Sequence, residues 1–173
     1  LALELARYAL PFEAQAKLWK TLDASYFVRH EAGLIAWHTR VLSKVLAQHP
    51  YFQQEIPAQE GRAQVAPLSA PFCVFARVSP AGAGLQVLVY ALDQPDLFAR
   101  LCAFFDQTQL SVNDAKIYTA PNAWVMDTFE LATPDAQVQA RELCSMIEAE
   151  LPRYLAEQGA LPAPKKGRVS RRV

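Results

Sequence analysis

The sequence predicts an α+β fold, because its apolar residues repeat first with the period of helices and later with the period of strands. Residues 1–48 carry apolar positions three and four apart, as in amphipathic helices. From residue 72 onward, short strand-like stretches and two helical stretches follow in the order ββαββα. We therefore expect an all-α segment followed by a four-stranded sheet that carries both later helices on one face.

Length and composition limit the class of protein. The 173 residues are 52% hydrophobic, and 17 basic residues balance 17 acidic ones. This suits one globular domain, or a small domain with an appendage, and overall charge indicates no partner. No apolar run approaches the length of a membrane span, which is about 20 residues. We expect a cytoplasmic protein that binds neither nucleic acid nor membrane.

The helical segment, residues 1–48, should contain two helices separated at Gly33. One apolar face collects aromatic residues that must be buried on something, either within the core or against a neighbouring domain: Trp19, Tyr26, Phe27 and Trp37. Residues 49–71 hold four prolines and no sustained period, which indicates a packed linker and a domain boundary.

The second domain should span residues 72–159. Residues 72–79 alternate, whereas residues 84–92 are apolar on both faces apart from Gln86, as in an interior strand. The Pro/Gly-rich stretch between them predicts a hairpin. A helix over 95–108, strands over 110–119 and 123–131, and a helix from about residue 135 follow, and Pro152 should kink or divide the last helix.

Strand order follows from the connections. A right-handed β-α-β crossover predicts that strands 84–92 and 123–131 are parallel neighbours, with strand 110–119 outside the latter and strand 72–79 on the other side. This is a ferredoxin-like plan. Residues 160–173 read as a basic linker, and we expect the chain to be a piece of a longer polypeptide because it begins at Leu1 inside a helical pattern.

The stretch "LQVLVYALDQPDLFARLCAFFDQTQLSVNDAKIYT" resembles an ACT domain, a small regulatory module that binds amino acids. With "SYFVRH", "IAWHTR" and "RVSRRV" around it, the chain is similar to the C-terminal region of the bifunctional PII uridylyltransferase/uridylyl-removing enzymes. The resemblance implies a parent enzyme that uses magnesium and UTP to modify the PII signalling protein, a hydrolase that reverses this, and ACT domains that sense glutamine. It implies no catalysis and no cofactor in this chain.

By the same resemblance, the turn after strand 84–92 is the effector site. Ligand contact is carried over to Asp93, Gln94, Pro95, Asp96 and Leu97, together with Asn113 and Asp114 from a neighbouring domain. Amide and carboxylate groups suit the α-amino and side-chain amide groups of glutamine, and free N–H groups at a helix start suit its carboxylate.

Other interpretations of these residues stay open. Asp93 is placed to cap the helix and Asp96 lies in its first turn, so both could be capping residues only, with Asn113 and Asp114 a strand-edge bulge. Many ACT domains have glycine where Asp96 stands, and a carboxylate there would repel the ligand's carboxylate. Glutamine could then bind only at the second ACT domain of the parent, or between the two.

The remaining reactive residues indicate structural roles. Cys73, Cys102 and Cys144 lie far apart without metal-site spacing and read as small buried hydrophobic residues. His30, His38 and His49 form no metal motif and read as packed or solvent-tipped side chains. Three hypotheses result: a glutamine-sensing regulatory module, a structural module for interdomain contact or a homodimer, and, least supported, a nucleic-acid-binding domain, because exposed aromatic residues are lacking on the strands.

Overall fold

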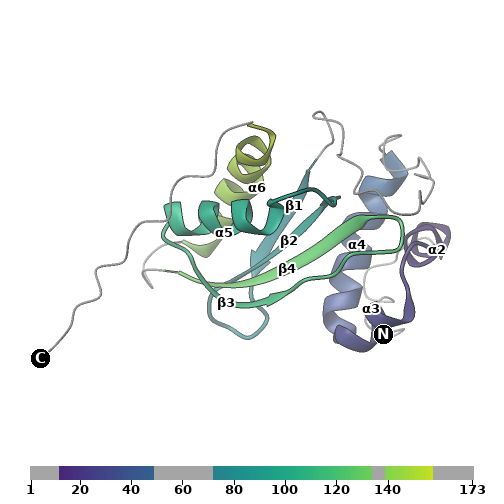
Figure 1. The fold of residues 1–173 in the computed structure, drawn as a ribbon. Coiled ribbons are helices and arrows are strands. Elements are labelled where there is room, and N and C mark those ends of the chain that lie inside the picture. The colour runs from purple at the N-terminus through teal and green to yellow at the C-terminus, as the bar shows by residue number, and fades with distance from the viewer. Residues whose placement is uncertain (1–11, 49–71, 134–138, 158–173) are drawn as a thin grey trace, which may run out of the picture.

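The computed structural model describes residues 12–48, 72–133 and 139–157. Three helices come first in the described chain, namely α2 (Phe12–Trp19), α3 (Ala24–Arg29) and α4 (Ala32–Gln48). They are followed by β1 (Cys73–Val78), β2 (Leu85–Leu92), α5 (Leu97–Gln107), β3 (Ser111–Lys116), β4 (Trp124–Ala132) and α6 (Ala140–Ala156). The expected α+β order is therefore confirmed (Figure 1). The linker 49–71, His49 and the tail 160–173 lie outside the described residues.

The sheet has the strand order β1-β2-β4-β3, and every neighbouring pair is antiparallel. The predicted parallel pairing of strands 84–92 and 123–131 is therefore wrong. Both β2 and β3 are antiparallel to β4, so β2 and β3 run in the same direction with β4 between them. A crossover through α5 requires the two strands that it joins to be parallel, but it does not require them to be adjacent.

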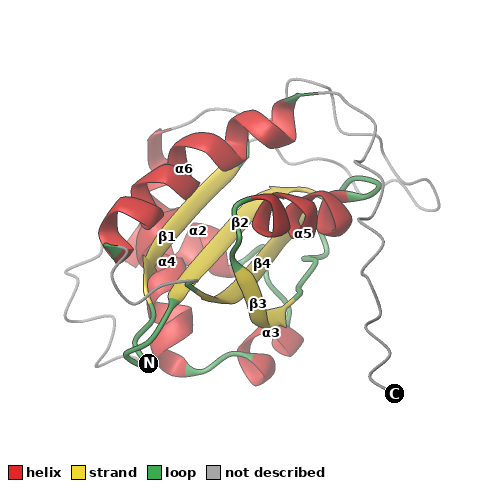
Figure 2. Cartoon of the chain, turned by 90° about the vertical axis from the view of Figure 1, so that its left-hand side faces the viewer, coloured by secondary structure: helices red, strands yellow, loops and turns green. Residues whose placement is uncertain are grey.

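Both faces of the sheet are covered. Helices α5 and α6 lie on one face, as expected, and α4 lies on the other (Figure 2). The first core contains Val87 and Phe129, whereas the second joins Leu88 and Met126 of the sheet to Trp37 of α4. All eight residues of β2 are buried, which explains why this strand shows no alternation of apolar and polar residues.

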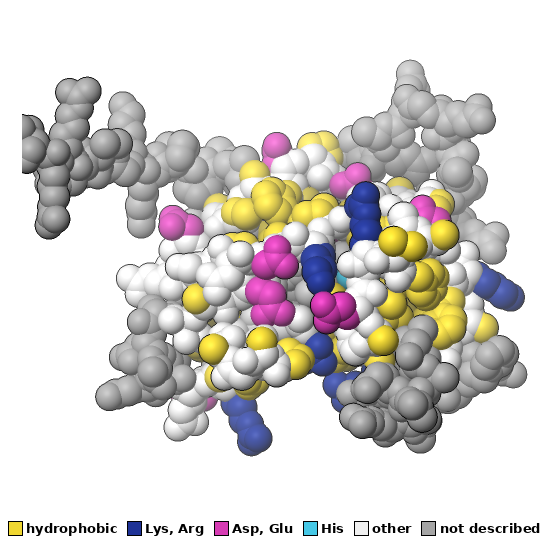
Figure 3. All heavy atoms as spheres, turned by 90° about the horizontal axis from the view of Figure 1, so that it is seen from below, with side chains coloured by type: hydrophobic (Ala, Val, Ile, Leu, Met, Phe, Trp, Pro, Cys, Tyr) yellow, Lys and Arg dark blue, Asp and Glu magenta, His cyan; other side chains and the backbone are white. Residues whose placement is uncertain are grey.

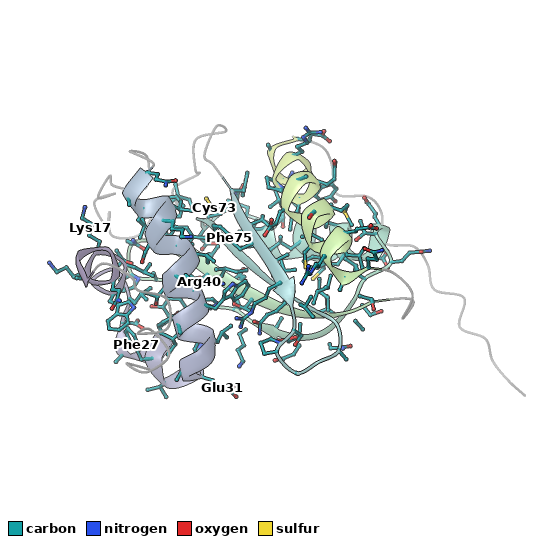
Figure 4. All side chains as sticks on the ribbon, turned by 180° about the vertical axis from the view of Figure 1, so that it is seen from behind. Lys17, Phe27, Glu31, Arg40, Cys73 and Phe75 are labelled. Atoms are coloured by element: carbon teal, nitrogen blue, oxygen red, sulfur yellow. The ribbon has the colours of Figure 1, made fainter. Side chains whose placement is uncertain are left out.

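The helical segment buries its aromatic residues on the sheet. Tyr26 and Trp37 are buried in the second core, and Trp19 and Phe27 pack at its margin. Figure 4 looks onto this layer, where α4 crosses in front of the sheet beside the β1 residues Cys73 and Phe75. The aromatic stripe thus has its partner within the chain.

Three element boundaries differ from the sequence prediction. Helix α3 ends before His30, which is its C-cap, and Gly33 lies in the first turn of α4, so the helix break precedes this glycine. Pro152 lies inside α6 without dividing it. Helix α5 begins at Leu97, two residues after Pro95.

The β1–β2 hairpin was predicted correctly. The backbone N–H of Ser79 donates to the carbonyl oxygen of Gly84 at 3.0 Å. Gly84 has a φ of +85°, and a Cβ atom there would collide with the carbonyl oxygen of Leu131. Only glycine fits this position, where β2 comes close to the backbone of β4.

Candidate functional site

The predicted effector turn, Asp93 to Asp96, connects β2 to α5 and lies beside the segment that precedes β4. The Asp93 N–H donates to the carbonyl oxygen of Ala123 at 2.8 Å, which fixes the start of the turn. Asp93, Pro95 and Asp96 are exposed, Gln94 is half-buried, and Leu97 is buried in the first core. The polar side chains of the turn are therefore accessible to solvent, while the hydrogen bond to Ala123 holds the backbone that carries them.

Asp96, not Asp93, occupies the N-cap position of α5. Its backbone is left-handed, with φ 61° and ψ 11°, and its side chain makes no capping hydrogen bond. The prediction that Asp93 caps the helix is wrong. A helix capped by Asp93 would begin at Gln94, whereas α5 begins at Leu97. A left-handed N-cap also differs from the extended conformation that aims a side-chain oxygen at the first turn.

The left-handed backbone explains why glycine suits the position of Asp96. Glycine adopts positive φ without strain, and aspartate is among the few other residues that tolerate it. Asp96 therefore preserves the backbone shape of the turn while adding a negative charge at its surface. The alternative in which Asp96 serves only as a side-chain cap is not what the structure contains.

Asn113 and Asp114 lie at the opposite end of the sheet from this turn. The register shifts between Val112 and Asp114, so Asn113 forms a bulge on exposed strand β3. Asp114 pairs with Glu130, whereas Leu92 pairs with Trp124. Six residues of strand span about 20 Å, so one chain does not bring the two groups together. A site that uses both requires a second copy or a neighbouring domain.

A buried carboxyl group, which the sequence reasoning missed, lies close to the turn. Asp127 of β4 is 3% exposed, and its Oδ1 accepts a hydrogen bond from the Tyr118 N–H at 3.3 Å. Burial, together with the smaller effect of the nearby negative charge of Asp93, raises the pKa of Asp127 to about 7, although the hydrogen bond from the Tyr118 N–H acts in the opposite direction. The signal was available in the sequence, because Asp127 shares its strand face with Val125 and Phe129.

A reciprocal pair of hydrogen bonds joins the helical segment to the segment between β3 and β4. The Tyr118 hydroxyl donates to Asp23 Oδ1 at 3.1 Å and accepts from the Asp23 N–H at 3.1 Å. The same carboxylate caps α3 by accepting from the N–H groups of Ser25 and Tyr26. Hydrogen bonding, first of all from the Ser25 hydroxyl, lowers the pKa of Asp23.

Two histidines are buried between the helical segment and the sheet. His38 Nδ1 lies 2.8 Å from the Tyr26 hydroxyl, and Nε2 lies 2.9 Å from the Thr128 hydroxyl. Burial lowers the pKa of His38 well below its usual value, so this histidine is neutral and structural. His30 Nδ1 donates to the Tyr26 carbonyl oxygen at 2.7 Å. The interpretation of both as packed side chains is confirmed.

The described ranges contain neither a candidate metal site nor a cysteine with the features of a reactive thiol. Residues 12–48, 72–133 and 139–157 contain no group of three His, Cys, Asp or Glu side chains that could hold a metal ion. All three cysteines are free, Cys144 is buried, and Cys73 and Cys102 are partly buried. Burial raises the pKa of Cys73 to about 11, which disfavours the reactive thiolate. None of the helices in these ranges has the length and apolar character needed to cross a bilayer.

Comparisons with known proteins match the chain over nearly its whole length. The family model of the fifth domain of uridylyltransferase GlnD matches residues 2–41. Bifunctional uridylyltransferase/uridylyl-removing enzymes of Burkholderia thailandensis and Burkholderia mallei are each 41% identical over 98% of this chain. The chain spans 18% of the length of each of these relatives. No solved structure matches it significantly.

Proposed function

The chain is homologous over almost its whole length to the C-terminal part of bifunctional uridylyltransferase/uridylyl-removing enzymes, and from this premise we propose that it is a regulatory module that senses glutamine. The observation that carries the proposal is that the match includes both the helical segment and the sheet domain with its turn. A module that binds a metabolite must also transmit the binding to another part of the protein, and here the two parts are packed together.

The turn from Asp93 to Asp96 supports a small polar ligand. Its polar side chains are exposed, its backbone is held by the hydrogen bond to Ala123, and no side chain of the N-cap residue occupies the first turn of α5. Backbone N–H groups at the start of a helix attract a carboxylate, and the side chains of Asp93 and Gln94 suit an ammonium and an amide group. Glutamine carries all three groups.

The second half of the site would come from outside this chain's own turn. Asn113 and Asp114 lie on an exposed edge strand about 20 Å from the turn along β4. A second copy, or the next ACT-like domain of the parent protein, would bring an equivalent edge to the turn. This is why the proposal includes a homodimer or a contact between domains.

The parent protein would supply the catalysis. In this proposal its other domains transfer UMP to the PII signalling protein and remove it again in the cytoplasm, and magnesium and UTP act there. The described part of this chain has no cluster of side chains fit for a metal ion. The module would act by changing how it packs against those domains, without chemistry of its own.

Calorimetric titration of the 173-residue chain with glutamine tests the proposal. We expect saturable binding that is abolished by Asp93→Ala and by Asn113→Ala, each of which removes one side of the site. Asp106→Ala is the matched control, because Asp106 is an exposed carboxylate of α5 away from the turn. Heats that stay at the level of dilution for wild type and for all variants would rule out glutamine sensing by this chain.

A structural module for assembly is the second candidate, and the exposed edge of the sheet favours it. Val112 and Ile117, in or next to β3, are 40% and 41% exposed beside the unpaired side of this strand. Such an edge can pair with another chain. Sedimentation that shows a concentration-dependent dimer, together with flat titrations for all common amino acids, would support this candidate instead.

Nucleic-acid binding has less support. In the face seen in Figure 3, acidic and basic side chains lie side by side and form no patch of positive charge. A basic stripe is what attracts a phosphate backbone.

A further inference from the structure

The segment between β3 and β4, residues 117–123, contacts both the candidate effector turn and the helical segment. At one side, the carbonyl oxygen of Ala123 accepts the Asp93 N–H at 2.8 Å. At the other side, the Tyr118 hydroxyl forms two hydrogen bonds with Asp23, which lies 95 residues away in sequence. Among the described residues, these two hydrogen bonds connect the N-cap residue of α3 to this segment.

The contact at the helical side is made to Asp23, the N-cap residue of α3. Asp23 Oδ1 accepts from the N–H groups of Ser25 and Tyr26, and the same atom accepts from Tyr118. A carboxylate oxygen held by Tyr118 is thereby fixed for capping. If the Tyr118 hydroxyl moved away, Asp23 would lose both hydrogen bonds to it, one at Oδ1 and one at the backbone N–H. The first turn of α3 would then be less stable.

The contact at the turn side involves the backbone at both ends of the segment. The Tyr118 N–H donates to Asp127 Oδ1, and the Tyr118 carbonyl oxygen accepts from the Met126 N–H at 2.8 Å. Ala123, at the other end, has a positive φ of 66°, and Asp96 across the turn has one of 61°. Non-glycine residues in this conformation store strain and concentrate at places that move or bind.

We propose that Tyr118 is a positioning residue that couples the turn from Asp93 to Asp96 to the start of α3, so that a ligand at the turn changes the stability of α3. The inference rests on the proposed glutamine site and adds the route by which binding leaves it. Asp93 and Asp127 are the carboxyl groups at the turn side of this route, and Asp23 is the carboxyl group at its other end.

Charge supplies a reason for the coupling. An ammonium group bound near Asp93 would also stabilise the ionised form of Asp127. An ionised carboxylate accepts a stronger hydrogen bond from the Tyr118 N–H than a neutral one does. The hydrogen bond from the Tyr118 N–H to Asp127 would then shorten when the ligand binds. This movement of the backbone would shift the Tyr118 ring, and with it the hydroxyl that bonds to Asp23.

Hydrogen exchange of backbone amides tests the coupling with Tyr118→Phe. Phenylalanine keeps the ring that packs against Tyr26 at 5.2 Å between centroids and loses only the two hydrogen bonds to Asp23. In the ligand-free chain we expect the Asp93 amide and the α3 amides to exchange about fivefold faster together, the factor that matches one hydrogen bond of ordinary net strength. Tyr154→Phe, which removes a hydroxyl from α6 beside Phe104, is the control and should change neither.

Addition of glutamine separates coupling from a merely structural role. In wild type and in Tyr154→Phe, saturating glutamine should change α3 exchange. In Tyr118→Phe, glutamine should still slow exchange at Asp93 to Leu97 but leave α3 unchanged, whereas a tyrosine that only stabilises the fold would leave the ligand response of α3 intact.

The failures of the two proposals are distinguishable. If glutamine changes exchange nowhere in wild type, the proposed glutamine site is wrong, and the ligand-free comparison still decides the coupling. If Tyr118→Phe accelerates α3 alone and leaves the Asp93 amide unchanged, Tyr118 does not connect the two, and the inference is overturned.

Discussion

Replacement of Asp127 by asparagine removes a buried negative charge while keeping an oxygen that can accept the Tyr118 N–H. The pKa of Asp127 is raised by burial from its ordinary value of 3.8 to about 7. The difference is about 3 units, and each unit corresponds to about 1.4 kcal/mol, so the ionised side chain destabilises the folded state by up to about 4 kcal/mol.

The sign of this effect sets the pH window. The folded state binds the Asp127 proton more tightly than the unfolded state does. The stability that this proton gives to the folded state is therefore fully present below pH 3.8 and is lost as the pH rises through about 7. At pH 4 the wild-type side chain is neutral when folded, and Asp127→Asn should be about as stable as wild type. At pH 8 the variant should be more stable, by up to about 4 kcal/mol.

Urea unfolding of both proteins at pH 4 and pH 8 measures this difference, since contributions from every other titrating group cancel in the comparison. Asp106→Asn is the control for loss of an exposed charge, and we expect it to change stability by less than about 0.5 kcal/mol at both pH values. A variant that is less stable than wild type at pH 8, or that differs from it equally at both pH values, would refute the burial argument.

Three further substitutions test the packing of the two layers. Burial lowers the pKa of His38 below 6.5, so the stabilisation that neutral His38 gives to the folded state is present above pH 6.5 and is lost on acidification. In urea unfolding, the free energy by which wild type exceeds His38→Gln should therefore shrink as the pH falls. A difference that grows on acidification would contradict a neutral His38. Gly84→Ala should cost at least about 1 kcal/mol and more than Gly82→Ala, because Gly82 has a similar positive φ but open space around it. Equal thermal shifts for the two variants would argue against the collision with Leu131. Leu88→Ala, at a fully buried position facing the helical segment, should cost about 2–5 kcal/mol in chemical unfolding, and a loss below about 1 kcal/mol would mean that this layer is not a packed core.

The sequence was sufficient for the elements and for the character of their faces. Helical spacing located α4 and α5, and the continuous apolar run of residues 84–92 identified β2 as an interior strand. Because this run has apolar residues on both faces, it also indicated that both faces of β2 are covered. Nothing in a pattern of apolar positions says which segment covers which face, so the packing of Trp37 on the sheet had to come from the structure.

The candidate turn was located correctly, but its conformation was not. Asp93 and Asp96 are both residue types that cap helices, and Pro95 between them fits a first helical turn, so the sequence favoured a cap three residues too early. The left-handed backbone of Asp96 depends on how the turn is anchored to Ala123, which is a contact distant in sequence. The predicted order of the strands was correct, but the predicted parallel direction of strands 84–92 and 123–131 was wrong, because the crossover through α5 joins β2 to β3 and fixes the direction of these two strands only.

The central claim, that this chain holds glutamine at the turn between β2 and α5, is tested most directly by a two-dimensional amide NMR titration of the 173-residue chain with glutamine. The account predicts saturable shifts at the amides of Asp93, Gln94, Asp96 and Leu97, accompanied by shifts at Asn113 and Asp114 from the edge that completes the site. A spectrum that stays unchanged at the turn up to millimolar glutamine, or that shifts only at residues far from it, would contradict the claim.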